Sequence, residues 1–142
     1  MITITNIRNA NPSFDETWAI VRSMKHKSKW IKQVPDLSPT TDLFFTYRSL
    51  LLTGKWNQQT FDKIYTPRFI TDLKRNTAAK QYLEYLYNAD QSGKHICLVC
   101  FCTNEALCHR SIIAGILAGS GCQVQTDTNR INTKYFDMYM SA

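Results

Sequence analysis

The chain has 142 residues, of which 44% are hydrophobic and 20% are charged, a composition typical of one globular domain rather than a disordered or fibrous chain. Its 17 lysines and arginines against 11 aspartates and glutamates give a net charge of +6, which favours an anionic partner. No apolar run reaches the roughly 18 residues of a membrane-spanning helix, and no secretory leader is recognisable, so we expect a soluble, cytoplasmic protein without a membrane partner.

The first third of the chain predicts two strands, a basic loop and a helix. Ile2 to Thr5 alternates in the manner of a strand, and the apolar run from Trp18 to Val21 predicts a second one. Residues 23 to about 41 are basic, irregular and interrupted by prolines, which predicts a long surface loop. Asp42 is in position to cap a helix that runs to Leu52.

The rest of the chain alternates helical and strand-like patterns. These predict, in order, a helix at about 58–74 interrupted near Pro67, a helix from Thr77 to Ser92, a strand at 96–102, a helix at 107–117, a strand at 122–125 and an aromatic C-terminal tail at about 128–142 that docks on the domain. Strands separated by helices predict a single Rossmann-like α/β domain over residues 1–142, with three layers around a mostly parallel sheet.

The turn between the cysteine-rich strand and its helix, CFCTNEALCHR at residues 100–110, carries the clearest chemical signal. The first N–H groups of a helix lack partners and its dipole is positive there, so anions are attracted. Ligands of parallel sheets bind beyond the carboxyl ends of the strands. We therefore expect Arg22, Ser23 and Arg110 to converge on one anion-binding pocket, which takes a nucleotide or another phosphate-bearing ligand.

Because a cytoplasmic protein is kept in a reducing compartment, its five cysteines are expected to be free thiols. Their positions in the sequence separate core cysteines from cysteines at the turn. Cys97 and Cys122 are expected to pack in the core as small apolar residues. Cys102 and Cys108 border the helix start, where the dipole and nearby cations stabilise a thiolate. Together with His109, a base near neutral pH, they are the candidate catalytic residues. The alternative is that all three only pack or donate hydrogen bonds at the turn.

Zinc accepts ligands of the types found at Cys100, Cys102, Cys108 and His109, but their spacing argues against a metal site. Neighbouring helix residues point about 100° apart, which separates the side chains of Cys108 and His109. Paired Cys-x-x-Cys knuckles are also absent from the sequence. We therefore expect neither a metal nor another cofactor.

The segment RSMKHKSKWIK, residues 22–32, interleaves cations with an indole ring. Lys25, Lys27 and Lys29 suit phosphates and Trp30 suits a stacked base, so these four are candidate nucleic-acid-binding residues, although a solvated loop has the same composition. The leading hypothesis is a nucleotide- or nucleic-acid-directed protein whose Cys/His/Arg site acts as an enzyme. The alternative is a non-enzymatic module, for instance viral, that binds nucleic acid or protein.

Two motifs carry a family resemblance: a strand that ends in Val21-Arg22-Ser23, and a strand cysteine, Cys100, that is followed by Cys108-His109-Arg110. In these motifs the chain resembles the bacterial and viral family known as domain of unknown function 488, over roughly residues 1 to 127. The resemblance implies a compact Rossmann-like domain and no settled activity. Many members carry an acidic residue where this chain has Cys102. Either Glu105 supplies that carboxylate or the chain belongs to a branch that only binds.

Overall fold

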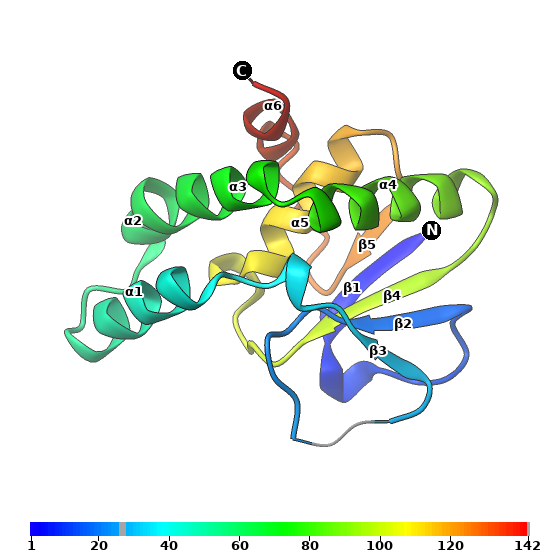
Figure 1. Cartoon of the computed structure of the whole chain (residues 1–142), viewed down its shortest axis with the longest axis horizontal. Coiled ribbons are helices and arrows are strands. Elements are labelled where there is room, and N and C mark those ends of the chain that lie inside the picture. The colour runs from blue at the N-terminus through cyan, green and yellow to red at the C-terminus, as the bar shows by residue number, and fades with distance from the viewer. Residues whose placement is uncertain (26–27, 142) are drawn as a thin grey trace.

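The computed structural model describes residues 1–25 and 28–141, within which five strands form one sheet in the order β3-β2-β4-β1-β5 (Figure 1). The strands are β1 (Ile2–Asn6), β2 (Glu16–Ala19), β3 (Ile31–Gln33), β4 (Ile96–Cys100) and β5 (Val124–Thr126). Every pairing between them is parallel. The central strand, β4, has all five residues buried, as its uninterrupted apolar sequence predicts for a parallel sheet covered on both faces.

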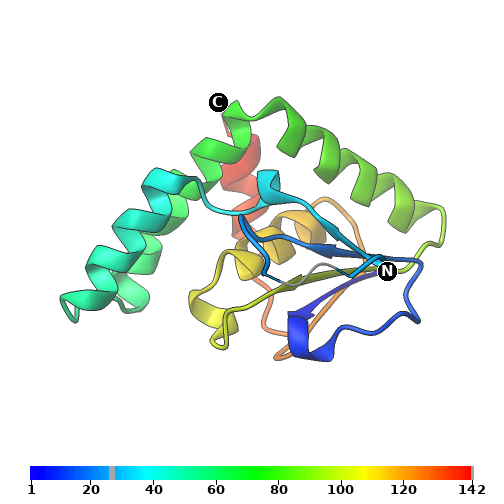
Figure 2. The same ribbon diagram turned by 60° about the horizontal axis from the view of Figure 1, so that its bottom comes forward.

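The helices are α1 (Thr41–Leu52), α2 (Gln58–Thr60), α3 (Thr66–Arg75), α4 (Thr77–Gln91), α5 (His109–Gly119) and α6 (Lys134–Met140). The crossovers from β3 to β4 and from β4 to β5 run in the same direction across the sheet, so right-handed connections bring their helices to one face. The β1–β2 connection, with a 3₁₀ turn at Ile7–Asn9, covers the other face (Figure 2). The expected Rossmann-like α/β fold is confirmed, with a thin third layer.

No helix in the described parts of the chain has the length and apolar character needed to cross a membrane. The helix starts follow local capping chemistry. The hydroxyl of Thr40 accepts a hydrogen bond from the Leu43 N–H at 3.2 Å, so Thr40 is the cap of α1 and the expected capping role of Asp42 is wrong. Pro67 lies in the first turn of α3, directly after a π-helical turn at Phe61–Tyr65, where its missing N–H is harmless.

The expected basic loop at 23–41 contains an element that the sequence pattern did not predict. Within it, β3 pairs with β2 at the edge of the sheet, through Thr17–Ala19 and Ile31–Gln33. The strand is three residues long and carries an exposed lysine, which is common on edge strands and gives no apolar alternation. The Gln33 amide donates to the Arg22 carbonyl at 2.8 Å, so this short strand anchors the chain at Arg22.

The aromatic tail forms α6, which packs on α5 through two glycines. A β-carbon added at Gly115 would lie 2.2 Å from the carbonyl oxygen of Asn132, and one added at Gly119 would lie 2.3 Å from the β-carbon of Phe136. Both distances are far below van der Waals contact. The glycines therefore allow α6 to approach the backbone of α5, which is the helix that also carries the residues of the cysteine motif.

Gly115→Ala is expected to destabilise the fold, even though alanine is the better helix former by about 1 kcal/mol. The added methyl group forces α6 away from α5 and exposes the aromatic side chains between them. Urea unfolding followed by circular dichroism should show a lower midpoint for the variant. An unchanged or raised midpoint would mean that α6 does not pack in this position.

Candidate functional site

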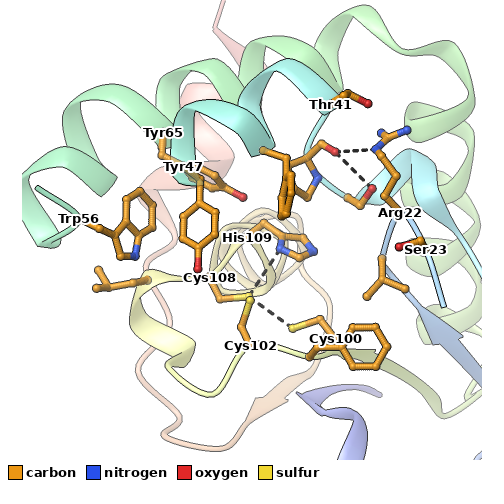
Figure 3. A pocket seen from close by; sticks show the side chains of 16 residues that line it. Arg22, Ser23, Thr41, Tyr47, Trp56, Tyr65, Cys100, Cys102, Cys108 and His109 are labelled. Atoms are coloured by element: carbon orange, nitrogen blue, oxygen red, sulfur yellow. Dashed lines mark hydrogen bonds between the residues drawn. The ribbon is translucent and has the colours of Figure 1, made fainter. Parts of the chain in front are cut away.

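A cavity of about 450 Å³ opens beyond the carboxyl ends of β2 and β4 (Figure 3). Both chain segments that leave these strands line it, through Val21–Ser23 on one side and Cys100–Cys102 on the other. The opposite wall is aromatic and comes from α1, the connection between α1 and α2, and the π-helical turn after α2, with Phe44, Tyr47, Trp56 and Tyr65. We call this cavity the aromatic pocket. It lies where a parallel sheet is expected to bind its ligand.

Three cysteines from separate points of the motif meet on the floor of this pocket. The sulfur atoms of Cys100, Cys102 and Cys108 all lie within 4.8 Å of one another, and those of Cys100 and Cys108 are 3.4 Å apart. We call these three residues the sulfur cluster. Cys100 and Cys108 are buried, whereas Cys102 is exposed. All five cysteines of the chain are free thiols.

Backbone geometry explains why the three sulfurs converge. Cys100 ends β4, and the side-chain amide of Asn6 holds the following turn by donating to the Cys102 carbonyl at 2.9 Å. Cys108 precedes the first turn of α5 in an extended conformation, with φ −125° and ψ 145°. The expectation that spacing keeps the cysteine and histidine ligands apart assumed that Cys108 is helical. The extended backbone instead lets the Cys108 sulfur reach Cys100, and the three sulfurs gather in a group that does not include His109.

The three thiols of the sulfur cluster differ in pKa. Hydrogen bonding by the thiols of Cys100 and Cys108, helped by the nearby Arg110 guanidinium and opposed by burial, lowers the pKa of Cys102. The interaction with Cys102 raises the pKa of Cys100 to about 12, and burial raises that of Cys108. A negative charge on the cluster therefore resides on the exposed sulfur, where a ligand can reach it.

His109 is buried beside the cluster and is held in one orientation. Its Nε2 lies 2.8 Å from the carbonyl oxygen of Ile20, and its Nδ1 lies 3.6 Å from the Cys108 sulfur. Burial lowers the pKa of the imidazole, so the neutral form dominates. A carbonyl oxygen only accepts hydrogen bonds, so Nε2 carries the proton and donates it, while the lone pair of Nδ1 faces Cys108.

Arg110 does not share the aromatic pocket with Arg22, and the expected convergence of the two guanidinium groups is wrong. The Arg110 side chain is 1% exposed and borders a second cavity of about 410 Å³, where its Nη1 lies 3.6 Å from an Asp127 carboxylate oxygen. The reason is that Arg110, the second residue of α5, is directed towards Asp127 just after the end of β5, whereas Arg22 follows the end of β2, and β4 and β1 lie between these two strands. The positive charge of Arg110 still helps to lower the pKa of Cys102, although the side chain does not line the aromatic pocket.

Glu105 does not supply a carboxylate to the aromatic pocket. It is buried beside the second cavity, where it accepts hydrogen bonds from the backbone N–H of Asp127 at 3.1 Å and from the Thr128 hydroxyl. These bonds attach the turn before α5 to the segment after β5. The carboxylate therefore has a structural position, and the alternative in which it replaces the family's acidic residue is not favoured.

Arg22 and Ser23 lie at the rim of the aromatic pocket, and both are exposed. The Nε of Arg22 donates to the Pro39 carbonyl at 3.0 Å, which fixes the guanidinium at the rim (Figure 3). Three of the basic-loop candidates, Lys25, Lys29 and Trp30, are exposed and do not line the pocket. Lys27 lies outside the residues that the structure describes.

The aromatic wall was not recognised from the sequence. Tyr47 extends from α1 towards the sulfur cluster (Figure 3), and its ring lies 4.8 Å from that of Trp56 in an edge-to-face contact. The signal that was available is the excess of apolar residues on α1, from Leu43 to Leu52, which is too many for a helix with one buried face. Leu51 and Leu52 are in fact exposed, and the rings of Phe44 and Tyr47 serve the pocket.

A family model described as "Active DUF488-N3 subclade" matches residues 3–121 of the chain. The match includes β1 to β4, the aromatic wall, the sulfur cluster and α5. Neither a curated protein nor a solved structure matches the chain.

Cys102 is expected to react first with iodoacetamide, because it is the exposed thiol of the five and the one whose pKa is lowered. In folded protein treated with chelator and reductant, peptide mapping should show Cys102 alkylated at least about tenfold faster than any other cysteine. In denaturant the five rates should become similar. Faster labelling of Cys100 or Cys108 in the folded protein would contradict the geometry described above.

Proposed function

We propose that this chain, which belongs to the DUF488-N3 branch of the domain of unknown function 488 family, binds a nucleotide in the aromatic pocket and acts on it at the sulfur cluster. One observation carries the proposal: a cavity with aromatic walls has an arginine at its rim and an exposed thiol on its floor. Its volume of about 450 Å³ is in the range of pockets for small molecules. A planar base, a phosphate and a sugar match these three features in that order.

The aromatic wall is suited to a planar base because its rings hold one another in place. Trp56 contacts Tyr47 and Tyr65 edge to face, with ring centroids 4.8 and 5.4 Å away. Such contacts leave a half-buried indole with a fixed orientation, which lowers the entropy lost when a base stacks on it. The wall therefore supports recognition of the base by stacking, which discriminates weakly between bases.

Arg22 and Ser23 support recognition of the phosphate. Because Pro39 engages only the Nε of Arg22, the terminal N–H groups of the guanidinium have no partner among residues 1–25 and 28–141. They are available for a paired contact with phosphate oxygens, and the exposed Ser23 hydroxyl is the adjacent donor. Arg110 is not included in this contact, because it borders the second cavity.

The sulfur cluster supports an enzyme rather than a binding module. Cys102 is its exposed member and the one that reaches the ligand, whereas Cys108 and His109 are buried and position the cluster from below. A thiol whose pKa is lowered in an otherwise apolar cavity has no evident role in binding a base or a phosphate. Chemistry on the bound nucleotide gives it one.

The rival function, nucleic-acid binding by the basic loop, rests on the exposure of Trp30, which is 42% accessible between Lys29 and Lys32. Binding there depends on phosphates along a strand and weakens steeply with salt. The two functions use different tryptophans. This difference makes them separable by experiment.

Trp56→Ala is expected to weaken nucleotide binding about 5- to 150-fold, which corresponds to the roughly 1–3 kcal/mol of one stacked base. Arg22→Ala should weaken it about tenfold, since one charged hydrogen-bonded contact is lost. Isothermal titration calorimetry with a panel of nucleoside mono-, di- and triphosphates measures both effects.

Trp30→Ala is the matched control, because it removes an indole from the same charged surface without touching the pocket. The proposal expects this variant to bind nucleotides like the wild-type protein. If Trp30→Ala abolishes binding while Trp56→Ala does not, or if affinity falls a hundredfold or more between about 50 and 200 mM salt, the basic loop is the binding site instead.

A further inference from the structure

We propose that the sulfur cluster is a zinc site, in which Cys100, Cys102 and Cys108 bind Zn²⁺ as thiolates and the remaining coordination position faces the aromatic pocket. The inference deepens the proposed function. It rests on that function only for the identity of the ligand that the zinc ion would contact in the pocket. Binding of the metal itself depends on the three cysteines alone and is tested without a nucleotide.

The distances between the sulfurs match a tetrahedral thiolate site. Zn–S bonds of about 2.3 Å set ligand sulfurs about 3.8 Å apart in a tetrahedron. Here the three sulfurs all lie within 4.8 Å of one another, and those of Cys100 and Cys108 are 3.4 Å apart. Movements of less than an ångström therefore convert the observed arrangement into a coordination triangle.

The ligands are held by rigid parts of the fold, so that little ordering remains to be done when the ion binds. Cys100 belongs to the fully buried central strand, and Cys108 is fixed at the start of α5. The loop that carries Cys102 is tied to β1 through the amide of Asn6, which donates to the Cys102 carbonyl at 2.9 Å. Ligands that the fold already holds in place are what a specific metal site requires.

The surroundings of the cluster complete the site. Three thiolates and one Zn²⁺ leave a single negative charge, and the buried Arg110 guanidinium follows Cys108 by two residues at the same helix start. Its Nε and Nη1 have no hydrogen-bond partner in the described structure, and Nη1 lies 3.6 Å from the Asp127 carboxylate, so an anionic metal site would add to the charge compensation of this cation. The His109 ring packs against Cys108, with its Nδ1 3.6 Å from the sulfur, and its bond to the Ile20 carbonyl fixes it there.

The other two cysteines show what ordinary packing looks like in this fold. Cys97 lies on the same strand as Cys100 but faces the opposite side of the sheet, and the Cys122 sulfur lies 3.7 Å from the Ser120 hydroxyl. Neither belongs to a group of three or more possible metal ligands in the described chain. Soft thiolates select zinc and related ions over Mg²⁺ or Ca²⁺, which identifies the metal class.

The test measures zinc in the full-length protein, produced in zinc-supplemented medium and purified without chelator. Elemental analysis is expected to give one zinc per chain, and replacement by Co²⁺ should produce the sulfur-to-cobalt charge-transfer absorption of thiolate ligands. Cys102→Ser should lower the zinc affinity more than about 100-fold, beyond the 10–100-fold typical of residues behind the ligands. Cys102 is exposed, so this variant should fold, and thermal unfolding checks that it does.

Cys122→Ser is the matched control and is expected to keep its zinc. The inference is overturned if the wild-type protein binds no zinc, if the cobalt form lacks the charge-transfer band, or if Cys122→Ser loses as much affinity as Cys102→Ser. A disulfide within the cluster of the protein purified in reductant would also overturn it. Nucleotide titration of the metal-free protein tests the proposed function separately, so either can fail without the other.

Discussion

Ile20 joins the three chain segments that build the pocket. Its N–H donates to the carbonyl of Val99 in β4 at 2.9 Å, and its own carbonyl accepts the Nε2–H of His109 at the start of α5 at 2.8 Å. The end of β2, the end of β4 and the beginning of α5 are thereby held together by two buried hydrogen bonds. An unpaired polar group at this depth costs about 1–3 kcal/mol, so the three segments keep their relative positions.

The orientation of the sulfur cluster follows from this junction. Because His109 is tied to Ile20, its other nitrogen faces Cys108, and Cys108 in turn faces Cys100 across 3.4 Å. The exposed Cys102 completes the group from the loop, at the side open to solvent. A substituted Ile20 side chain would leave these bonds intact, since both use the backbone. The constraint thus depends on the backbone of Ile20 and on the imidazole of His109, and not on the Ile20 side chain.

Charge is distributed around the pocket in two layers. Arg22 lies at the rim with terminal N–H groups available, whereas Arg110 lies below the floor, between Asp127 at 3.6 Å and the sulfurs. Burying a guanidinium is costly unless negative charge is close by, and a carboxylate on one side with thiolate character on the other supplies it. The two arginines therefore lie on different sides of the sulfur cluster, Arg22 at the rim of the aromatic pocket and Arg110 beside the second cavity.

The sequence by itself determined the Rossmann-like α/β class, the strand that leads to the cysteines and the helix that follows the cysteine turn, because apolar periodicity and capping chemistry are local properties. The same locality brought Cys102, Cys108 and His109 to one turn. Only the tertiary structure decided that Cys108 is extended and reaches Cys100, that Arg110 points away from Arg22, and that rings from α1 and Trp56 wall the pocket. These facts depend on backbone torsions at one residue and on the packing of segments about fifty residues apart, and neither leaves a pattern along the chain.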